Sequence, residues 1–203
     1  RLGLEFLEFL NCQGFTTLYN RSYNSAKNLS YHVIIDCLKT PQMYDKVKRV
    51  DQIWKRELVR LIPELGAELE EGFDSDSTNQ PLHKHHFFNA ISNVFTIWNN
   101  PLIVFWDDIQ WGDAETLEWI DYHFHHYSDT PLLILAAARS NELTDNAELS
   151  NVIASLEKAG VSDHIDVQSL DKFQSSELIT ELMDGSVSQD AKEYLFRETR
   201  GNP

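Results

Sequence analysis

The chain has 203 residues, of which 42% are hydrophobic and 24% are charged, and these proportions are ordinary for a globular protein. This length allows one substantial α/β domain with at most a small helical appendage. The formal net charge of −15 disfavours direct binding to nucleic acid or to an anionic membrane surface. No stretch approaches the roughly 20 apolar residues of a membrane-spanning helix and no signal peptide is visible, so we expect a cytoplasmic protein.

The chain begins at Arg1 with a helical pattern that no capping residue precedes, and it stops at Pro203. We therefore expect a fragment cut from a longer polypeptide. Its two cysteines, Cys12 and Cys37, both lie in apolar helical patterns. We expect both to be buried, reduced thiols and not a disulfide or redox pair.

Helical and strand patterns alternate in the first half of the chain. Apolar residues predict a helix over residues 2–10 that stops near Gly14, and β-branched residues predict a strand over 15–19. After a polar loop over 20–30, apolar positions at helical spacing predict helices over 31–38, 45–61 and 81–98. Residues 68–80 are acidic and serine-rich, so we expect a mobile loop. We exclude a calcium loop there because the glycine and the final glutamate are missing.

The second half contains two wholly apolar runs, over residues 102–106 and 131–138, which predict buried strands. A shorter strand is expected over 164–167. Helices are predicted over 114–127, 149–159, 171–183 and 188–198, the last two beginning at capping residues. Strands that alternate with helices, two of them wholly apolar, predict an α/β fold with a parallel sheet covered by helices on both faces.

Two carboxylates, Asp107 and Asp108, directly follow the run over 102–106. The carboxyl end of a parallel strand is where open α/β sheets hold their ligands. In phosphoryl-transfer enzymes one such acid holds Mg²⁺, while a neighbouring group orients the attacking water. On these residues alone, an acidic turn that only caps the next helix explains the pattern equally well.

The segment Phe105-Trp106-Asp107-Asp108-Ile109-Gln110-Trp111-Gly112-Asp113, followed by Thr116-Leu117, resembles a known ATPase family. It is similar to the module of the signal-transduction ATPases with numerous domains (STAND), P-loop NTPases related to the AAA+ proteins. The nearest likeness is to large bacterial transcriptional activators and adenylate-cyclase-linked regulators. Weaker matches follow in order along the chain: Asn20-Arg21-Ser22-Tyr23, Leu29-Ser30-Tyr31, Trp54-Lys-Arg-Glu-Leu58, Leu61-Ile-Pro-Glu-Leu65, Arg139 with Glu142, Ser169-Leu170 and Thr199-Arg-Gly201-Asn202-Pro203.

The resemblance implies ATP and Mg²⁺ as cofactors and assigns a role to each matching residue. Asp107 would hold Mg²⁺ through water, Asp108 would polarise the attacking water, and Arg139 would sense the γ-phosphate. In the closing motif, Gly201, Asn202 and Pro203 would bind the nucleotide, with Pro203 packing on the adenine base. For Trp111 and Asp113, packing and helix capping are the expected roles.

The family's Gly-x-x-x-x-Gly-Lys-[Ser/Thr] loop is missing from these residues, and so is the strand before it. The resemblance therefore implies a partial P-loop core over residues 1–168 and the start of a helical lid or winged-helix-side subdomain over 169–203. We expect the chain alone to be a poor ATP binder. The strands beside the missing one would be completed by a longer parent, by rearrangement or by self-association.

Several functions stay open at this point. The favoured one is a nucleotide-controlled switch with slow hydrolysis. Its expected partners are the nucleotide and the other domains of a multidomain transcriptional regulator. The alternative is a scaffold that keeps the fold without hydrolysis. A metal-dependent hydrolase would need a further acid or histidine beside Asp107 and Asp108. The pairs His83/His86 and His123/His126 lack the further ligands of a zinc site.

Overall fold

The computed structural model describes residues 1–69, 81–98, 100–143, 146–183 and 187–202. The chain divides into two compact units, Arg1–Ser162 and Asp163–Pro203. The predicted loop over 68–80 falls almost entirely outside the described residues, and so does Pro203.

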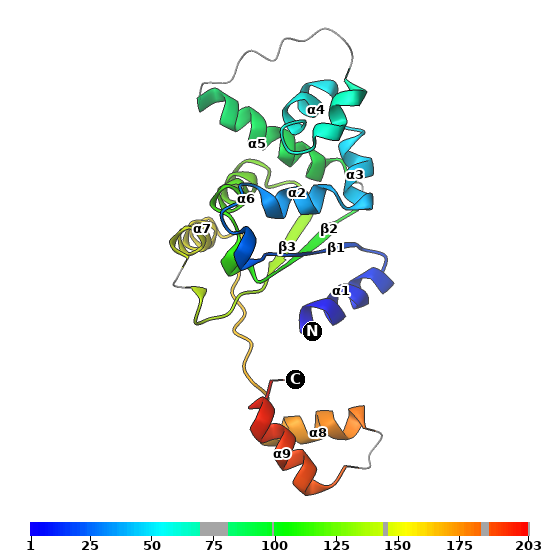
Figure 1. Cartoon of the computed structure of the whole chain (residues 1–203), viewed down its shortest axis with the longest axis vertical. Coiled ribbons are helices and arrows are strands. Elements are labelled where there is room, and N and C mark those ends of the chain that lie inside the picture. Colours follow the sequence, from blue (N-terminus) through cyan, green and yellow to red (C-terminus); the bar gives the residue numbers. More distant parts are fainter. Residues whose placement is uncertain (70–80, 99, 144–145, 184–186, 203) are drawn as a thin grey trace. The chain divides into compact units, whose positions relative to one another are not determined.

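The first unit is built on a parallel sheet of three strands, in the order β1 (Thr16–Arg21), β2 (Leu102–Asp107) and β3 (Leu132–Ala136) (Figure 1). The register places Leu102 opposite both Thr16 and Leu132. Central strand β2 is buried along its apolar length, because helices cover both of its faces. The predicted α/β class is thus confirmed as a parallel three-stranded sheet with helices around it.

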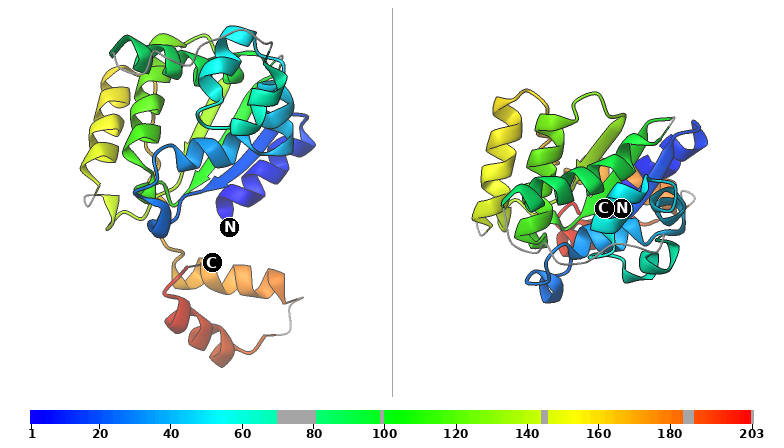
Figure 2. Two further views of the ribbon diagram at one scale, coloured as in Figure 1. Left: turned by 45° about the horizontal axis from the view of Figure 1, so that its top comes forward. Right: turned by 90° about the horizontal axis from the view of Figure 1, so that it is seen from above.

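One face of the sheet carries most of the helices: α2 (His32–Leu38), α5 (Pro81–Thr96), α6 (Ala114–His126) and α7 (Ala147–Lys158). Leu102, Val104 and Trp106 point into this large core, since alternate residues of a strand face the same side. The other face carries α1 (Leu2–Cys12), whose Leu7 packs with Ile103 and Phe105 (Figure 2).

Residues 41–58 form two helices, α3 (Pro41–Val47) and α4 (Gln52–Leu58), so the prediction of one continuous helix over 45–61 was wrong. Pro41 starts α3, because its fixed φ suits the first turn of a helix. The apolar periodicity hides the break, since Val47, Val50 and Leu58 on both sides of the turn all enter the large core. Short 3-10 helices lie at Asn24–Ala26 (η1), Pro63–Glu68 (η2) and Ile109–Trp111 (η3).

The two cysteines differ. Cys37 is buried in α2, as predicted, and burial raises the pKa of its thiol to about 12. Cys12 is exposed at the end of α1, so the prediction that it is buried was wrong. The reason is that α1 buries one side, through Leu7, while Phe6 and Phe9 stay exposed on its other sides.

The second unit pairs α8 (Lys172–Leu182) with α9 (Gln189–Thr199). Asp171 and Ser188 cap these helices through side-chain oxygens, as predicted. The predicted strand over 164–167 was wrong: these residues have no regular structure, and Ile165 and Val167 are exposed. A strand is held by hydrogen bonds to a neighbouring strand. Among the described residues, no strand pairs with this segment.

Candidate functional site

The candidate site is at the carboxyl end of the sheet, where the chain leaves β2. Asp107 is the last residue of β2 and lies opposite Arg21, the last residue of β1. Asp108 adopts a left-handed conformation, with φ 54° and ψ 41°, and the chain then enters η3. Aspartate tolerates this region better than most residues, because its short polar side chain bonds locally.

Asp108 is the centre of a network of charged and polar groups. Its Oδ2 accepts two hydrogen bonds from Arg21, from Nε at 3.0 Å and from Nη2 at 2.7 Å. Its Oδ1 accepts from Gln110 Nε2 at 3.3 Å and lies 3.7 Å from Arg139 Nε. The Asp108 side chain is only 10% exposed. We call Asp107, Asp108, Arg21 and Arg139 the acid–arginine cluster.

Asp107 makes fewer contacts than Asp108. Its Oδ1 accepts from the backbone N–H of Asp108 at 3.1 Å, and its Oδ2 accepts from the Tyr19 hydroxyl at 3.2 Å. The pKa of the Tyr19 hydroxyl is raised, mainly by partial burial and to a smaller extent by the nearby negative charge of Asp107. Each Asp107 oxygen therefore keeps acceptor capacity, because a carboxylate oxygen has two lone pairs.

Arg139 follows β3 and is held by an ion pair and an aromatic ring. Its Nη1 donates to Glu142 Oε1 at 3.0 Å, and its guanidinium lies 5.2 Å from the centre of the Trp111 ring. Gln110 Nε2 also donates to Glu142 Oε2 at 3.2 Å. Gln110 therefore links Asp108 to the ion pair of Glu142 with Arg139. Trp111 thus has a contact that its predicted packing role did not include, since an aromatic face attracts a cation.

Asp113 is the capping residue of this loop, as predicted. Its Oδ1 accepts from the backbone N–H of Thr116 at 2.9 Å and of Tyr31 at 2.7 Å, and its Oδ2 accepts from Thr116 Oγ1 at 2.7 Å. Nδ1 of His32 lies 3.0 Å from the same carboxylate. Asp113 therefore caps α6 and fixes the start of α2. Asp107 and Asp108 have no part in that cap, so they are not explained as an acidic cap.

The structure thus brings Asp107, Asp108 and Arg139 together. Of the closing motif, Gly201 and Asn202 belong to the second unit, and Pro203 lies outside the described residues. Gly201 has φ +78°, and a Cβ there would lie 2.0 Å from the Leu170 carbonyl oxygen, so only glycine fits. Sequence reasoning quoted Arg21 without a role. The predicted strand ended at Tyr19 and put Arg21 in a polar loop, whereas Arg21 is the last residue of β1, which is why its contact with Asp108 was missed.

His123 and His126 have partners within the protein. His123 is fully buried, with Nδ1 3.0 Å from Ser92 Oγ, and burial lowers its pKa to about 4. Nδ1 of His126 lies 2.9 Å from the Tyr122 carbonyl oxygen. The side chain of His83 lies outside the described ones. Among the residues that the structure describes, no group of three or more His, Cys, Asp or Glu is placed to hold a metal ion.

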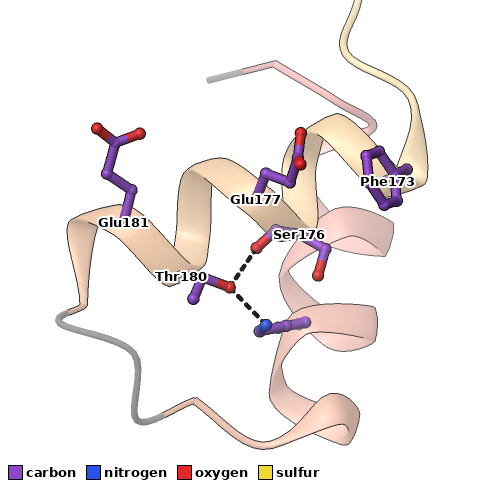
Figure 3. A pocket seen from close by; sticks show the side chains of 6 residues that line it. Phe173, Ser176, Glu177, Thr180 and Glu181 are labelled. Carbon is purple, nitrogen blue, oxygen red and sulfur yellow. Dashed lines mark hydrogen bonds between the residues drawn. The ribbon is translucent and has the colours of Figure 1, made fainter.

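Two pockets are lined by residues outside the acid–arginine cluster. One, of about 450 Å³, lies on the second unit and is lined by Phe173, Ser176, Glu177, Thr180, Glu181 and Lys192 (Figure 3). In it, Thr180 Oγ1 donates to the Ser176 carbonyl and accepts from Lys192 Nζ. The other, of about 430 Å³, lies on the first unit and includes Tyr31, Arg60 and Phe87. Neither includes Asp107, Asp108 or Arg139.

Comparisons with known proteins add no assignment: no family model, no curated protein and no solved structure matches the chain. Across the described parts of the chain, no helix has both the length and the apolar character to cross a membrane. Function is therefore inferred from the acid–arginine cluster and its place on the sheet.

Proposed function

We propose that the chain is part of a P-loop ATPase module of the STAND type, which acts as a Mg-ATP-controlled conformational switch in a multidomain regulator. The observation that supports this most is the meeting of Asp107, Asp108 and Arg139 at one edge of a parallel sheet. That edge is where α/β sheets bind ligands, and paired acids beside a cation suit a magnesium-bound phosphate.

The residues present fit this role in part. Asp107 retains acceptor capacity on both oxygens and would hold the water shell of Mg²⁺, which binds proteins through few carboxylates and keeps several waters. Arg139 is 54% exposed and would donate to a phosphate oxygen. The 203 residues contain no Gly-x-x-x-x-Gly-Lys-[Ser/Thr] loop to supply backbone N–H groups.

When bound, Mg-ATP would supply a phosphoryl group for transfer to water. Asp108 would then accept the proton of that water, while Arg139 would hold the phosphate at the end of β3. Asp107, through Mg²⁺, and Arg139 would hold the same phosphate, which would add a link between the end of β2 and the residues after β3 to the Asp108–Arg139 contact already present. A link that is made with nucleotide and lost after hydrolysis is a switch.

A scaffold that keeps this fold without hydrolysis is the second candidate. It is favoured by the network around Asp108, whose two oxygens already face Arg21, Gln110 and Arg139. Such a fully partnered carboxylate also suits a purely structural ion pair. Single-turnover hydrolysis of ATP separates the two candidates: Asp108→Asn abolishes turnover in a switch, while a scaffold has no turnover to lose.

Calorimetric titration with Mg-ATP tests the proposal, on the 203-residue chain and on the full-length gene product. We expect binding by the full-length product and its loss on Asp107→Ala. The matched control is Asp129→Ala, which removes an exposed carboxylate from the turn before β3. Weak or no binding by the 203-residue chain is expected, because it has no phosphate-binding loop. Absence of binding by the full-length product contradicts the ATPase reading.

A further inference from the structure

The pocket of about 430 Å³ on the first unit has no part in the proposed function. Three segments form it: the chain around the start of α2, the turn after α4 and the first two turns of α5. Its hydrophobic lining consists of Tyr31, Ile35, Leu61 and Phe87. Small-molecule sites typically have volumes of about 300–1,000 Å³ and a mainly apolar lining with a few polar groups, so this pocket has the size and composition of a ligand site.

Tyr31 and Phe87 form an aromatic wall that is held in place by the fold. Their rings meet edge to face, with 5.1 Å between the ring centres. Tyr31 has φ 60°, which is uncommon for a bulky residue, and its backbone N–H donates to Asp113 Oδ1 at 2.7 Å. Phe87 is buried in α5. The wall is therefore present without a ligand, as in most small-molecule sites.

The polar part of the lining is cationic. It contains Arg60 and Lys84 beside Ser30, and among the residues that the structure describes no acid lines the pocket. The whole chain has 32 acidic residues and only 17 lysines and arginines, so this lining runs against the charge of the protein. Two cations beside an apolar wall suit a ligand with an anionic end and an apolar body.

Both cations are able to bind a further anion. Their side chains are about half exposed, at 46% for Arg60 and 48% for Lys84. Arg60 pairs with Glu57 at 3.3 Å, and Lys84 donates to Glu118. A guanidinium and an ammonium each carry several N–H donors, so one acidic partner leaves donors for the anionic end of a ligand.

Two acids border the pocket without lining it. Glu115 accepts from Ser30 Oγ at 2.9 Å, and Glu118 accepts from Lys84. Burial first, and then these two charges, raise the pKa of Tyr31 to about 12, so its hydroxyl stays protonated at neutral pH and is a donor. A ligand anion would therefore meet a hydroxyl donor and two cations in the lining, whereas a ligand cation would meet two like charges there.

We propose that this pocket is a second ligand site, which binds a small organic anion with an apolar body, such as an aromatic carboxylate. Arg60 and Lys84 pair with the charged end of this ligand, and Tyr31 and Phe87 pack on its body. The inference goes beyond the proposed function and does not depend on it, because the pocket shares no lining residue with the acid–arginine cluster.

Titration of the 203-residue chain with 2-naphthoate, followed by nuclear magnetic resonance, tests the site. The comparison ligand is 2-naphthamide, which has the same rings without the charge. Naphthoate is expected to shift the backbone N–H signals of Tyr31, Ile35 and Phe87 and to bind about fivefold more tightly than the amide.

Arg60→Gln and Lys84→Gln should each weaken the binding of naphthoate by up to about fivefold, the upper range for a half-exposed charge pair, and leave that of the amide unchanged. The matched control is Arg49→Gln, which removes an exposed cation outside the pocket and should change neither affinity.

Three results would overturn the proposal, and each leaves the ATPase proposal standing. The first is no binding of naphthoate at millimolar concentration. The second is a set of shifts confined to residues outside the pocket, such as the exposed Phe6 and Phe9 of α1. The third is equal affinity for naphthoate and naphthamide, or naphthoate binding that neither Arg60→Gln nor Lys84→Gln weakens, because the ligand would then not be recognised by its charge.

Discussion

Asp113 joins the start of α6 to the start of α2, and its replacement by alanine is expected to destabilise the first unit by about 3 kcal/mol. Loss of a helix cap alone costs about 1 kcal/mol. The N–H of Tyr31 and the buried hydroxyl of Thr116 lose their acceptor as well, and each unsatisfied donor adds at least about 1 kcal/mol. Asp113→Asn, which keeps one carbonyl acceptor, should lose about half as much.

The assay is urea unfolding followed by far-ultraviolet circular dichroism, which reports on the helices of both units, with an unchanged slope against urea as the sign that the unfolded state is the same. The matched control is Asp171→Ala, which removes the cap of α8; its side chain accepts only a local bond from Gln174. That control should cost no more than about 1 kcal/mol. An Asp113→Ala cost as small as the control's would refute the reasoning, because Asp113 would then cap one helix and no more.

Three further outcomes are expected. Burial lowers the pKa of His123 from 6.5 to about 4, so its stabilising neutral form is fully present above pH 6.5 and the free energy of unfolding falls toward pH 4. That fall is at most about 1.4 kcal/mol per pH unit. The urea midpoints at pH 7 and pH 5 should therefore differ less in the His123→Gln variant than in the unsubstituted chain. A thiol reagent should label Cys12 at once and Cys37 only on unfolding, since Cys37 is buried with a pKa raised to about 12; equal rates would contradict this. Gly201→Ala should lower the free energy of unfolding by more than about 1 kcal/mol, because its Cβ would clash with the Leu170 carbonyl oxygen. The Leu170 N–H bonds to the Gly201 carbonyl, so an unchanged rate of hydrogen exchange at that N–H would show that the clash is relieved.

The presence of strands was predictable from wholly apolar runs, but their burial was not: the run over 131–138 forms β3, in which Leu133 is 49% exposed, so its predicted burial was wrong. The run over Leu102–Asp107 is wholly apolar up to its last residue and is flanked by turn residues, and it forms the central strand. Residues 164–167 alternate polar and apolar side chains and form no strand, since pairing depends on a neighbouring strand that the local pattern does not contain. The break between α3 and α4 was also hidden, because a turn that buries Val50 preserves the apolar spacing.

The site was predictable only as far as its members follow strands. Asp107 and Asp108 follow β2 and Arg139 follows β3, so parallel pairing is enough to bring them to one edge. The contact between Arg21 and Asp108 joins residues 87 positions apart, and it depends on a register that no local pattern reveals. The capping role of Asp113 was visible, whereas its bond to the Tyr31 N–H was not, for the same reason.

The measurement that tests the central claim most directly is magnesium-dependent ATP binding by the full-length gene product, by calorimetry, beside its Asp107→Ala variant. Binding is expected to need Mg²⁺ and to disappear in the Asp107→Ala variant, while Asp129→Ala binds normally. Binding that is independent of Asp107, or none at all, would contradict a nucleotide site at the carboxyl end of β2.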